Sequence, residues 1–371
     1  MKIAINCRSF LKDQYTGIGR YAYNLVKFLS EIDNENEYYL YAHKGIFDRK
    51  RKIPRFDAPN FHVKVDYLNR GPDRALNNID IYHAPSPDRL DIVGVKVIVT
   101  VHDLIYLTYP QGHTPQTIEE THKQFQQIMQ RSEKIICVSK STMGDLQRHF
   151  DVSPSKMRLV YQGIDRDVFY PMETPEKKMA QELVRSKGIN VPFILFVGTI
   201  EPRKNLDGLI RAFSVLKDKK IFTGKLVIIG MKGWMEGPVF DVIERFKLHD
   251  DVIFLGYLSS QELCYFYNMA EVFVFPSFYE GFGFPIVEAM SCGTPVVTSN
   301  KSSCPEVAGE AALTVDPHNP LEIAEAIKRI LQDKDLQKSL KEKGLHRALD
   351  FSFVSTAKNT LRVYKEVGPG L

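Results

Sequence analysis

The stretch that decides the fold most clearly is residues 272–298, VFVFPSFYEGFGFPIVEAMSCGTPVVT. Residues 272–275 form an apolar run of strand length, and a loop rich in glycine and phenylalanine follows them. Pro285 fits the first position of a helix and Gly293 fits the position just past its end, which predicts a short helix between them. A second apolar run begins at residue 295. The stretch therefore predicts a strand, a helix and another strand in succession.

The same alternation extends over almost the whole chain of 371 residues. Strands that alternate with helices predict an α/β fold with parallel sheets covered on both sides. Near-continuous apolar runs such as residues 225–229 fit strands that are buried on both faces. We expect strands at residues 2–6, 38–42, 62–65, 79–83, 96–101, 134–138, 158–161, 193–198, 225–230, 252–255, 272–275, 295–298 and 312–315.

The alternation breaks at residues 166–191, a stretch that contains Pro171 and Pro175. We expect the domain boundary there, with one domain over residues 1–170 and the other over 171–352. Each domain is expected to hold a Rossmann-like, doubly wound parallel sheet, and the two are expected to face each other across a cleft. Ligands of such sheets bind outside the carboxyl ends of the strands, and each motif described below follows a strand.

The composition is that of an ordinary soluble globular protein, with 44% hydrophobic and 25% charged residues. A net charge of +4, without a basic stripe, argues against a nucleic-acid binder. The five cysteines lack C-x-x-C spacing, which favours buried reduced thiols over disulfides or a metal cluster. The chain shows neither a cleavable leader nor an apolar run near the roughly 18 residues of a membrane span. We therefore expect a cytoplasmic protein.

Arg203 and Lys204 are adjacent cations in a loop that follows the strand expected at 193–198. A helix is expected directly after them, with Asn205 as its N-cap. Two cations beside a helix N-terminus suit a diphosphate, because the charge of a leaving group must be neutralised as it develops. The alternative is a solvated loop with surface charges.

Glu280 and Glu288 belong to the stretch quoted first. Glu280 lies in the loop and Glu288 in or near the first turn of the helix, so the two need not share a role. The aromatic residues of the loop argue against a bland surface loop, because exposed phenylalanines are costly. One alternative is the acid and nucleophile of a glycosidase. Another is that Glu288 only complements the helix dipole.

Two further motifs lie in the first half of the chain. Residues 16–20, TGIGR, follow the first strand, and Gly17 and Gly19 allow the backbone to approach an anion at a helix N-terminus. The absence of a third glycine argues against a dinucleotide site, and a tight turn is the alternative. His102, with Asp103, follows the strand at 96–101 and could bond a substrate hydroxyl that Asp103 orients. The alternative is a histidine that caps the strand end.

Two features have simpler interpretations. Asp165-Arg166-Asp167 has the D-x-D spacing of metal-dependent sugar transferases, but its place after Gly163 favours a turn. Residues 44–74 contain nine Lys or Arg against four Asp, including the run at 49–52. This segment fits a solvated loop, and contact with an anionic membrane is the alternative.

Taken together, these segments resemble the retaining glycosyltransferase family 4, which has the GT-B fold. The resemblance runs from residues 16–20 to 351–353. Its most specific element is Glu280 with seven residues before Glu288, combined with residues 201–205 about 80 residues earlier. Ser139 and Gly163-Ile164-Asp165 also match family signposts.

The resemblance implies a role for each site residue. Arg203 and Lys204 would bind the donor diphosphate, Glu280 the hydroxyls of the transferred sugar, Glu288 the ribose, and His102 the donor sugar near the reaction centre. The full set of residues that the resemblance implies for binding of the nucleotide sugar is Gly17, Gly19, Arg203, Lys204, Glu280, Gly281, Phe282, Gly283 and Glu288.

The resemblance also implies the chemistry. Such enzymes usually need no metal and no cofactor, and the last helix, residues 353–366, packs back on the first domain. The reaction would be a same-face displacement in which the leaving phosphate takes the proton of the acceptor. The protein would then supply position and charge.

Within the family, residues 17–21 and 101–104 look like those of bacterial mannosyltransferases that build surface polysaccharides. This favours GDP-mannose as the donor, with UDP-sugars left open, and a glycan or lipid-linked acceptor at the inner membrane face. Two alternatives remain. One is a nucleotide-sugar epimerase on the same fold. The other is a non-catalytic sugar-nucleotide-binding protein, which could keep Arg203 and Lys204 while losing His102 or Glu280.

Overall fold

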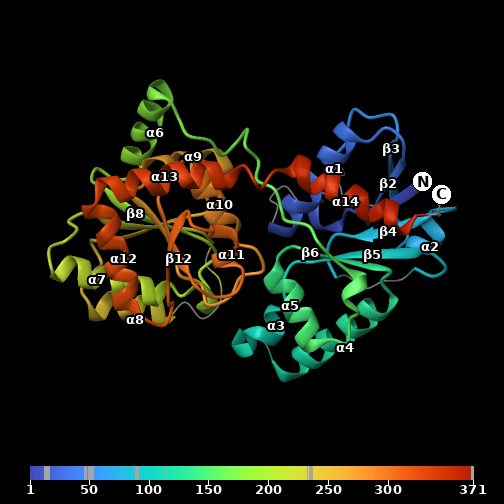
Figure 1. The fold of residues 1–371 in the computed structure, drawn as a ribbon, viewed down its shortest axis with the longest axis horizontal. Coiled ribbons are helices and arrows are strands. Elements are labelled where there is room, and N and C mark those ends of the chain that lie inside the picture. Colours follow the sequence, from blue (N-terminus) through green and yellow to red (C-terminus); the bar gives the residue numbers. More distant parts are fainter. Residues whose placement is uncertain are drawn as a thin grey trace. The chain divides into compact units, whose positions relative to one another are not determined.

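The computed structural model describes residues 1–11, 17–45, 48, 54–87, 92–112, 114–231, 233 and 237–368. It divides into two compact units, Met1–Gly163 with Ser352–Leu371, and Ile164–Phe351. Each unit is built on a parallel sheet with helices packed against it (Figure 1). The expected α/β class with two Rossmann-like parallel sheets is confirmed.

The division falls after Gly163, whereas the sequence places the boundary after residue 170. The reason lies in the contacts of residues 164–170. The Ile164 amide donates to the Phe351 carbonyl at 3.1 Å, and the Phe169 ring packs edge-on against Tyr267 with 6.0 Å between centroids. These residues therefore pack with the second unit.

In the first unit, the described strands form a seven-stranded sheet of order β3-β2-β1-β4-β5-β6-β7. The chain order reverses between β1 (Lys2–Asn6) and β4 (Ile81–Ala84), which is where a doubly wound sheet opens its ligand crevice. The other strands are β2 (Glu37–His43), β3 (Phe61–Asp66), β5 (Lys96–Val101), β6 (Lys134–Cys137) and β7 (Met157–Leu159).

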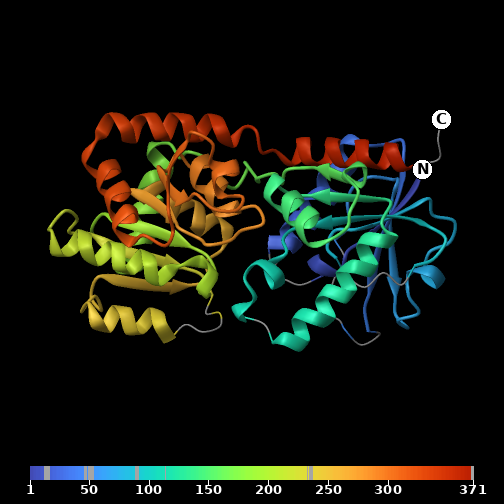
Figure 2. The ribbon, with the colours of Figure 1, turned by 60° about the horizontal axis from the view of Figure 1, so that its bottom comes forward.

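Helix α14 (Phe353–Val367) packs against α1 (Gly17–Ile32) in the first unit, and the Phe28 and Phe353 rings stack at 5.8 Å (Figures 1 and 2). Gly163 permits this approach, because a Cβ there would lie 2.2 Å from the Phe353 amide nitrogen. The remaining helical segments of the first unit are η1 (Arg8–Phe10), α2 (Pro72–Ala75), α3 (Ile105–Thr108), η2 (Pro110–Gly112), α4 (Pro115–Arg131), α5 (Lys140–His149) and η3 (Pro154–Lys156).

In the second unit, six described strands follow the order β10-β9-β8-β11-β12-β13. The order reverses between β8 (Phe193–Val197) and β11 (Val272–Phe275), and every residue of both strands is buried. The other strands are β9 (Lys225–Ile229), β10 (Val252–Gly256), β12 (Val296–Ser299) and β13 (Ala312–Val315). The helical segments are α6 (Thr174–Ser186), η4 (Pro202–Lys204), α7 (Leu206–Asp218), α8 (Gly237–Arg245), α9 (Ser260–Met269), α10 (Phe284–Ser291), α11 (Cys304–Ala308), α12 (Pro320–Gln332) and α13 (Lys334–Ala348).

All thirteen expected strands are present among the described residues, with ends shifted by at most two residues. Two helix starts differ from expectation. Helix α1 begins at Gly17, so Gly17 and Gly19 lie in its first turn instead of in a loop before it. Helix α10 begins at Phe284, so Pro285 occupies the second helical position, while Gly293 follows the helix end with φ +71° as expected.

All five cysteines, each within the described residues, are buried with free thiols, as the sequence predicts. In the described part of the chain, no helix is both long and apolar enough to cross a bilayer.

Candidate active site

The two motifs of the second unit meet at the carboxyl edge of its sheet, at the reversal point. Residues 202–204 form η4 after β8, and the loop that carries Glu280 follows β11. The Phe278 amide donates to the Arg203 carbonyl at 2.8 Å, which joins the two loops directly. Parallel strands that are neighbours in the sheet thus bring together residues more than 70 positions apart.

Four charged side chains gather there, and we call Glu201, Arg203, Lys204 and Glu280 the ion cluster. Lys204 Nζ lies 2.5 Å from Glu280 Oε1, and Arg203 Nη1 lies 3.0 Å from Glu280 Oε2. Arg203 also pairs with Glu201 at 2.5 Å and donates to the Tyr279 carbonyl at 3.1 Å. The cluster holds two positive and two negative groups, so its charges balance.

The ion cluster is shielded from solvent, since Lys204 is 7% exposed and Glu280 is 6% exposed. Burial disfavours an ionised carboxyl, but the attraction of Arg203 and Lys204 exceeds this effect and lowers the pKa of Glu280 below its ordinary value of 4.5. Glu280 is therefore a carboxylate at neutral pH. The alternative of a solvated loop with surface charges is wrong for these cations.

Serines after β12 hold the Glu280 loop in place, and the sequence analysis does not find them. Ser302 Oγ accepts from the Glu280 amide at 2.9 Å. Ser303 Oγ lies 2.9 Å from the carbonyl oxygens of both Glu280 and Phe282. Their one available signal is that, like the other motifs, they follow a buried strand at the same edge of the sheet.

Asn205 has a different role from the one expected. It adopts φ +56°, and within the described residues its side chain makes no capping bond. Its Nδ2 instead donates to the Pro276 carbonyl at 3.1 Å and the Pro317 carbonyl at 2.6 Å. A Cβ at Gly208 would lie 2.3 Å from Asn205 Oδ1, so the glycine is required. Asn205 therefore ties the cation loop to the loops after β11 and β13.

Glu288 lies in a different environment from Glu280, as expected. It is 2% exposed, and the Tyr267 hydroxyl donates to its Oε2 at 2.9 Å. The first turn of α10 contains no acidic residue, and Glu288 is the fifth residue of the helix, so it lies near the first turn but not in it. The dipole alternative for Glu288 is weakened for the same reason, because the dipole effect is confined to the first turn.

The loop between the two glutamates is built mainly for packing. Phe282 is 4% exposed, and its ring contacts Phe284 at 5.4 Å and Phe351 at 5.6 Å edge to face. Gly283 has φ +101°, which favours glycine at the residue that precedes α10. Gly281 and Gly283 flank Phe282, so these glycines allow the chain to turn from Glu280 into the helix.

In the first unit, His102 follows β5 and is 7% exposed. Its Nε2 lies 2.7 Å from the Pro85 carbonyl and its Nδ1 lies 3.1 Å from Gln162 Nε2. The Tyr21 ring packs edge-on against the imidazole at 4.9 Å. Burial lowers the pKa of His102, while the Pro85 carbonyl and the charge of Asp103 oppose that effect. His102 is therefore neutral at pH 7, and both ring nitrogens have partners within the protein.

Neighbouring residues support His102 by means that the sequence does not reveal. Asp103 Oδ1 accepts from the Ile105 amide at 3.1 Å, so Asp103 starts the next turn of chain. Ser139 caps α5 by accepting from the Thr142 amide at 3.0 Å, and the Thr142 hydroxyl donates to the His102 carbonyl at 3.1 Å. Gly17 is exposed and Gly19 is buried after β1, at the reversal point of this sheet.

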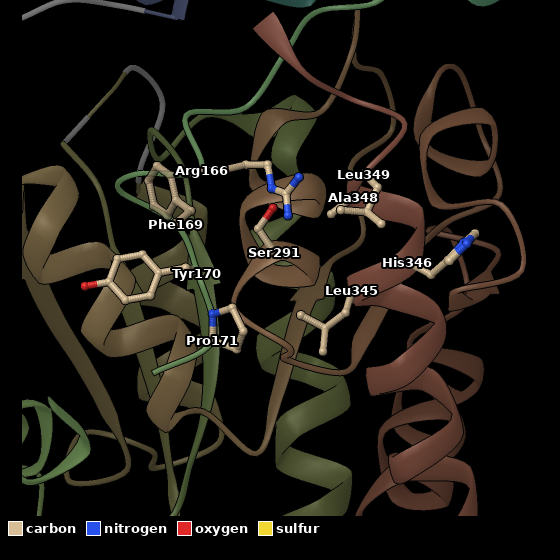
Figure 3. A pocket seen from close by; sticks show the side chains of 9 residues that line it. All are labelled: Arg166, Phe169, Tyr170, Pro171, Ser291, Leu345, His346, Ala348 and Leu349. Atoms are coloured by element: carbon tan, nitrogen blue, oxygen red, sulfur yellow. The ribbon is translucent and has the colours of Figure 1, made fainter. Parts of the chain in front are cut away.

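A cavity of about 580 Å³ lies in the second unit at the far end of α10 from the Glu280 loop (Figure 3). Helix α10 has 8 residues, a length of about 12 Å, so the cavity is separate from the ion cluster. Arg166 and Ser291 point toward each other across it (Figure 3). Its lining is Arg166, Phe169, Tyr170, Pro171, Ser291, Leu345, His346, Ala348 and Leu349.

The remaining motifs of the sequence are resolved in part. The Asp167 amide donates to Asp165 Oδ1 at 3.2 Å, so the D-x-D segment is a turn, as expected. The basic run at 49–52 lies outside the described residues. Farther along that segment, Tyr67 is 49% exposed and Leu68 is 64% exposed.

Comparison with known proteins identifies the family of both units. A family described as Glycosyltransferase Family 4 matches residues 15–168, and one described as Glycosyl transferases group 1 matches residues 179–347. The chain is 30% identical over 380 residues to O-antigen chain mannosyltransferase B of Escherichia coli. This alignment covers 96% of this chain and 97% of the relative.

Solved structures agree on the fold. Sucrose-phosphate synthase from Thermosynechococcus elongatus superposes with a TM-score of 0.77 at 21% identity, over 99% of this chain and 98% of that one. HepE of Anabaena, solved in complex with UDP-glucose, superposes with a TM-score of 0.74 at 18% identity, over 99% and 100% of the two chains. The chain therefore belongs to glycosyltransferase family 4 and is a glycosyltransferase with the GT-B fold.

Proposed function

We propose that this glycosyltransferase transfers mannose from GDP-mannose, with retention of anomeric configuration, to a glycan or lipid-linked acceptor in surface polysaccharide synthesis. The observation that carries the proposal is the ion cluster at the reversal point of the second sheet. The choice of mannose is supported by the O-antigen mannosyltransferase that matches almost the full chain.

The ion cluster suggests how the donor binds. The Glu280 carboxylate takes the place at Arg203 and Lys204 that a diphosphate would need. A bound diphosphate replaces that carboxylate as the partner of both cations, and each charge-assisted bond contributes about 1.5–3 kcal/mol. Glu280 is then released to accept bonds from hydroxyls of the transferred sugar. Donor binding and sugar recognition are coupled through this one exchange.

The same charges support the chemistry. Negative charge develops on the leaving diphosphate, and Arg203 and Lys204 neutralise it without reorganisation. The phosphate oxygen takes the proton of the acceptor hydroxyl as the new bond forms on the same face of the sugar. His102 is neutral and contacts the donor sugar near the reaction centre. With two cations for the phosphates, the reaction proceeds without a metal ion.

Glu288 binds the ribose hydroxyls of the nucleotide in this proposal. It is carried by the helix that begins at the Glu280 loop, and the Tyr267 hydroxyl fixes its carboxylate. Gly17 and Gly19, in the first turn of α1, contribute backbone amides toward the phosphates.

We propose that the protein works in the cytoplasm and that its acceptor-binding unit makes weak contact with an anionic membrane. Exposed Tyr67 and Leu68 provide apolar contact, and Arg70 and Arg74 follow them with positive charge. Flotation with vesicles that contain anionic lipid tests this contact. Binding that is unaffected by Leu68→Ser would contradict it.

The test of the function is a product assay with GDP-mannose and a membrane extract that carries the unfinished polysaccharide. We expect mannose in the acceptor fraction, an α-linkage that retains the donor configuration by NMR, and full activity in excess EDTA. An epimerised nucleotide sugar without acceptor product would support the epimerase instead. Donor binding with neither product would support a sugar-nucleotide-binding protein.

A further inference from the structure

Gln162 contacts His102 although the sequence assigns it no role. It lies three residues beyond β7, is 2% exposed, and places its Nε2 3.1 Å from His102 Nδ1. Its Oε1 is buried and has no hydrogen-bond partner among the described residues. A buried amide oxygen without a hydrogen-bond partner is uncommon, so the burial of Gln162 beside His102 calls for an explanation.

The partners of His102 determine which way the Gln162 amide faces. The Pro85 carbonyl can only accept, so His102 Nε2 must carry the proton in that 2.7 Å bond. A neutral imidazole has one N–H, which leaves Nδ1 as an acceptor. Gln162 must therefore present its NH₂ group to Nδ1. The opposite orientation of the amide would set its oxygen against the lone pair of Nδ1.

The other described groups that face the imidazole are uncharged. The charge state of the imidazole therefore depends on these two bonds and on Asp103. Tyr21 presents a ring edge, and its hydroxyl lies 3.3 Å from Thr100. His83 bonds Thr100 and Tyr364, and burial lowers the pKa of His83 to about 3, so it is uncharged. Among the described residues, Asp103 is the charged side chain that acts on the ring, and it favours the imidazolium. Gln162 opposes Asp103, because an NH₂ donor cannot bond an Nδ1 that carries a proton.

We propose that Gln162 is a positioning residue that holds His102 as the neutral Nε2–H tautomer in one ring orientation. The proposal rests on the function proposed above for His102. Glycosyl transfer builds positive charge on the sugar ring in the transition state. An imidazolium beside that sugar would repel the charge, whereas a neutral imidazole does not. Gln162 thereby leaves the proton of the acceptor to the leaving phosphate.

The test is Gln162→Glu, which replaces the donor at Nδ1 with an acceptor. We expect His102 to gain a proton at Nδ1, and the acid limb of the pH profile of transfer to move upward by at least one pH unit. Gln126→Glu is the matched control, because Gln126 Nε2 lies 3.2 Å from a ring nitrogen of His122 on an exposed face of α4. The control should leave the pH profile of transfer unchanged.

Imidazole ¹⁵N NMR measures which ring nitrogens of His102 carry a proton and does not require transfer activity. With His102 assigned through His102→Gln, the native protein should show the Nε2–H tautomer from pH 6 to 8, and Gln162→Glu should show imidazolium. A native His102 that is charged, or protonated at Nδ1, overturns the proposal. An imidazolium in Gln162→Glu with an unmoved acid limb also overturns it, since the tautomer would not matter for transfer.

Gln162→Met covers the case in which a buried carboxylate prevents folding. Met keeps the length of the side chain but gives Nδ1 no donor, so His102 should become imidazolium at a higher pH than in the native protein, while Pro85 keeps the proton of the neutral ring on Nε2. An unchanged pH of protonation in this variant would show that Pro85 alone fixes the ring and would overturn the proposal. If the native protein shows the expected tautomer but no transfer with any donor, the proposed function fails while the Gln162–His102 pair stands.

Discussion

The ion cluster and His102 lie at the carboxyl edges of two different sheets, and they differ in how they tolerate burial. The ion cluster balances two cations against two carboxylates within bonding distance. Within the described part of the chain, His102 has no ion pair of that kind, and a carbonyl and an amide hold its buried ring. Under the proposed function the contrast separates two tasks: strong charges bind phosphates, while an uncharged ring lies beside a sugar that becomes positively charged.

The comparison also explains how the ion cluster tolerates burial. An unpaired buried charge is costly, so the cations need a partner when the diphosphate is absent. Glu280 supplies that partner, and in the proposed function it leaves the cations for sugar hydroxyls when the diphosphate binds. His102 needs no such substitute, because its neutral ring is already satisfied.

The largest expected effect comes from Lys204→Met, which leaves the buried Glu280 short of one partner. We expect a loss of about 3–5 kcal/mol in the free energy of unfolding, measured by urea denaturation. The matched control is Lys328→Met, which breaks a surface pair with Glu325 at 3.0 Å. That control should lose less than about 1 kcal/mol. Equal losses in the two variants would contradict the description of the ion cluster as a buried network.

Glu280→Gln removes the carboxylate that, in the proposed function, competes with the diphosphate and then binds the sugar. GDP should bind at least as tightly as to the native protein, by calorimetry. Turnover of the sugar donor should fall about 10- to 150-fold, which corresponds to a loss of about 1.5–3 kcal/mol. A loss of GDP affinity in this variant would reverse the assigned role of Glu280.

Glu288→Ala should show the opposite pattern, because the ribose is common to donor and product. GDP affinity is expected to fall about 10-fold or more. Tyr267→Phe removes only the hydroxyl that holds Glu288, so its effect should be smaller, about 2- to 10-fold. If both variants bind GDP as the native protein does, Glu288 and Tyr267 are a structural pair.

The smallest expected effect is the loss of folding stability at acidic pH. The pKa of Glu280 is lower in the folded protein than its ordinary value of 4.5, because Arg203 and Lys204 outweigh the effect of burial. Its contribution to stability is therefore complete above pH 4.5 and is lost as pH falls through the lower, folded pKa. Below pH 4.5, the melting temperature of the native protein should fall more steeply than that of Glu280→Gln. A steeper fall in the variant would contradict the paired carboxylate.

Local patterns were enough to predict much of this. The strands are short apolar runs, and their order along the chain already placed Arg203, Lys204, Glu280 and His102 after strands, where ligands bind. The sequence could not supply contacts between distant segments. Gln162 meets His102 across 60 positions, and Ser303 holds the Glu280 loop from 23 positions away.

The errors have the same origin. Asn205 fits an N-cap by residue type, but two carbonyls from other loops draw its side chain away and fix it with positive φ. The helix starts at Gly17 and Phe284 lie earlier than glycine or proline signals place them. Such boundaries depend on packing against the rest of the unit, which a local signal does not contain.

The most direct test of the central claim is a thermal-shift panel of sugar nucleotides on the native protein and on Arg203→Ala. Bound donor raises the melting temperature by mass action. We predict the largest shift with GDP-mannose, a smaller shift with UDP-sugars, and affinity reduced about 10- to 150-fold in Arg203→Ala. A shift that is equally large in Arg203→Ala, or a native protein that none of the sugar nucleotides stabilises, would contradict the assignment of the ion cluster as the donor site.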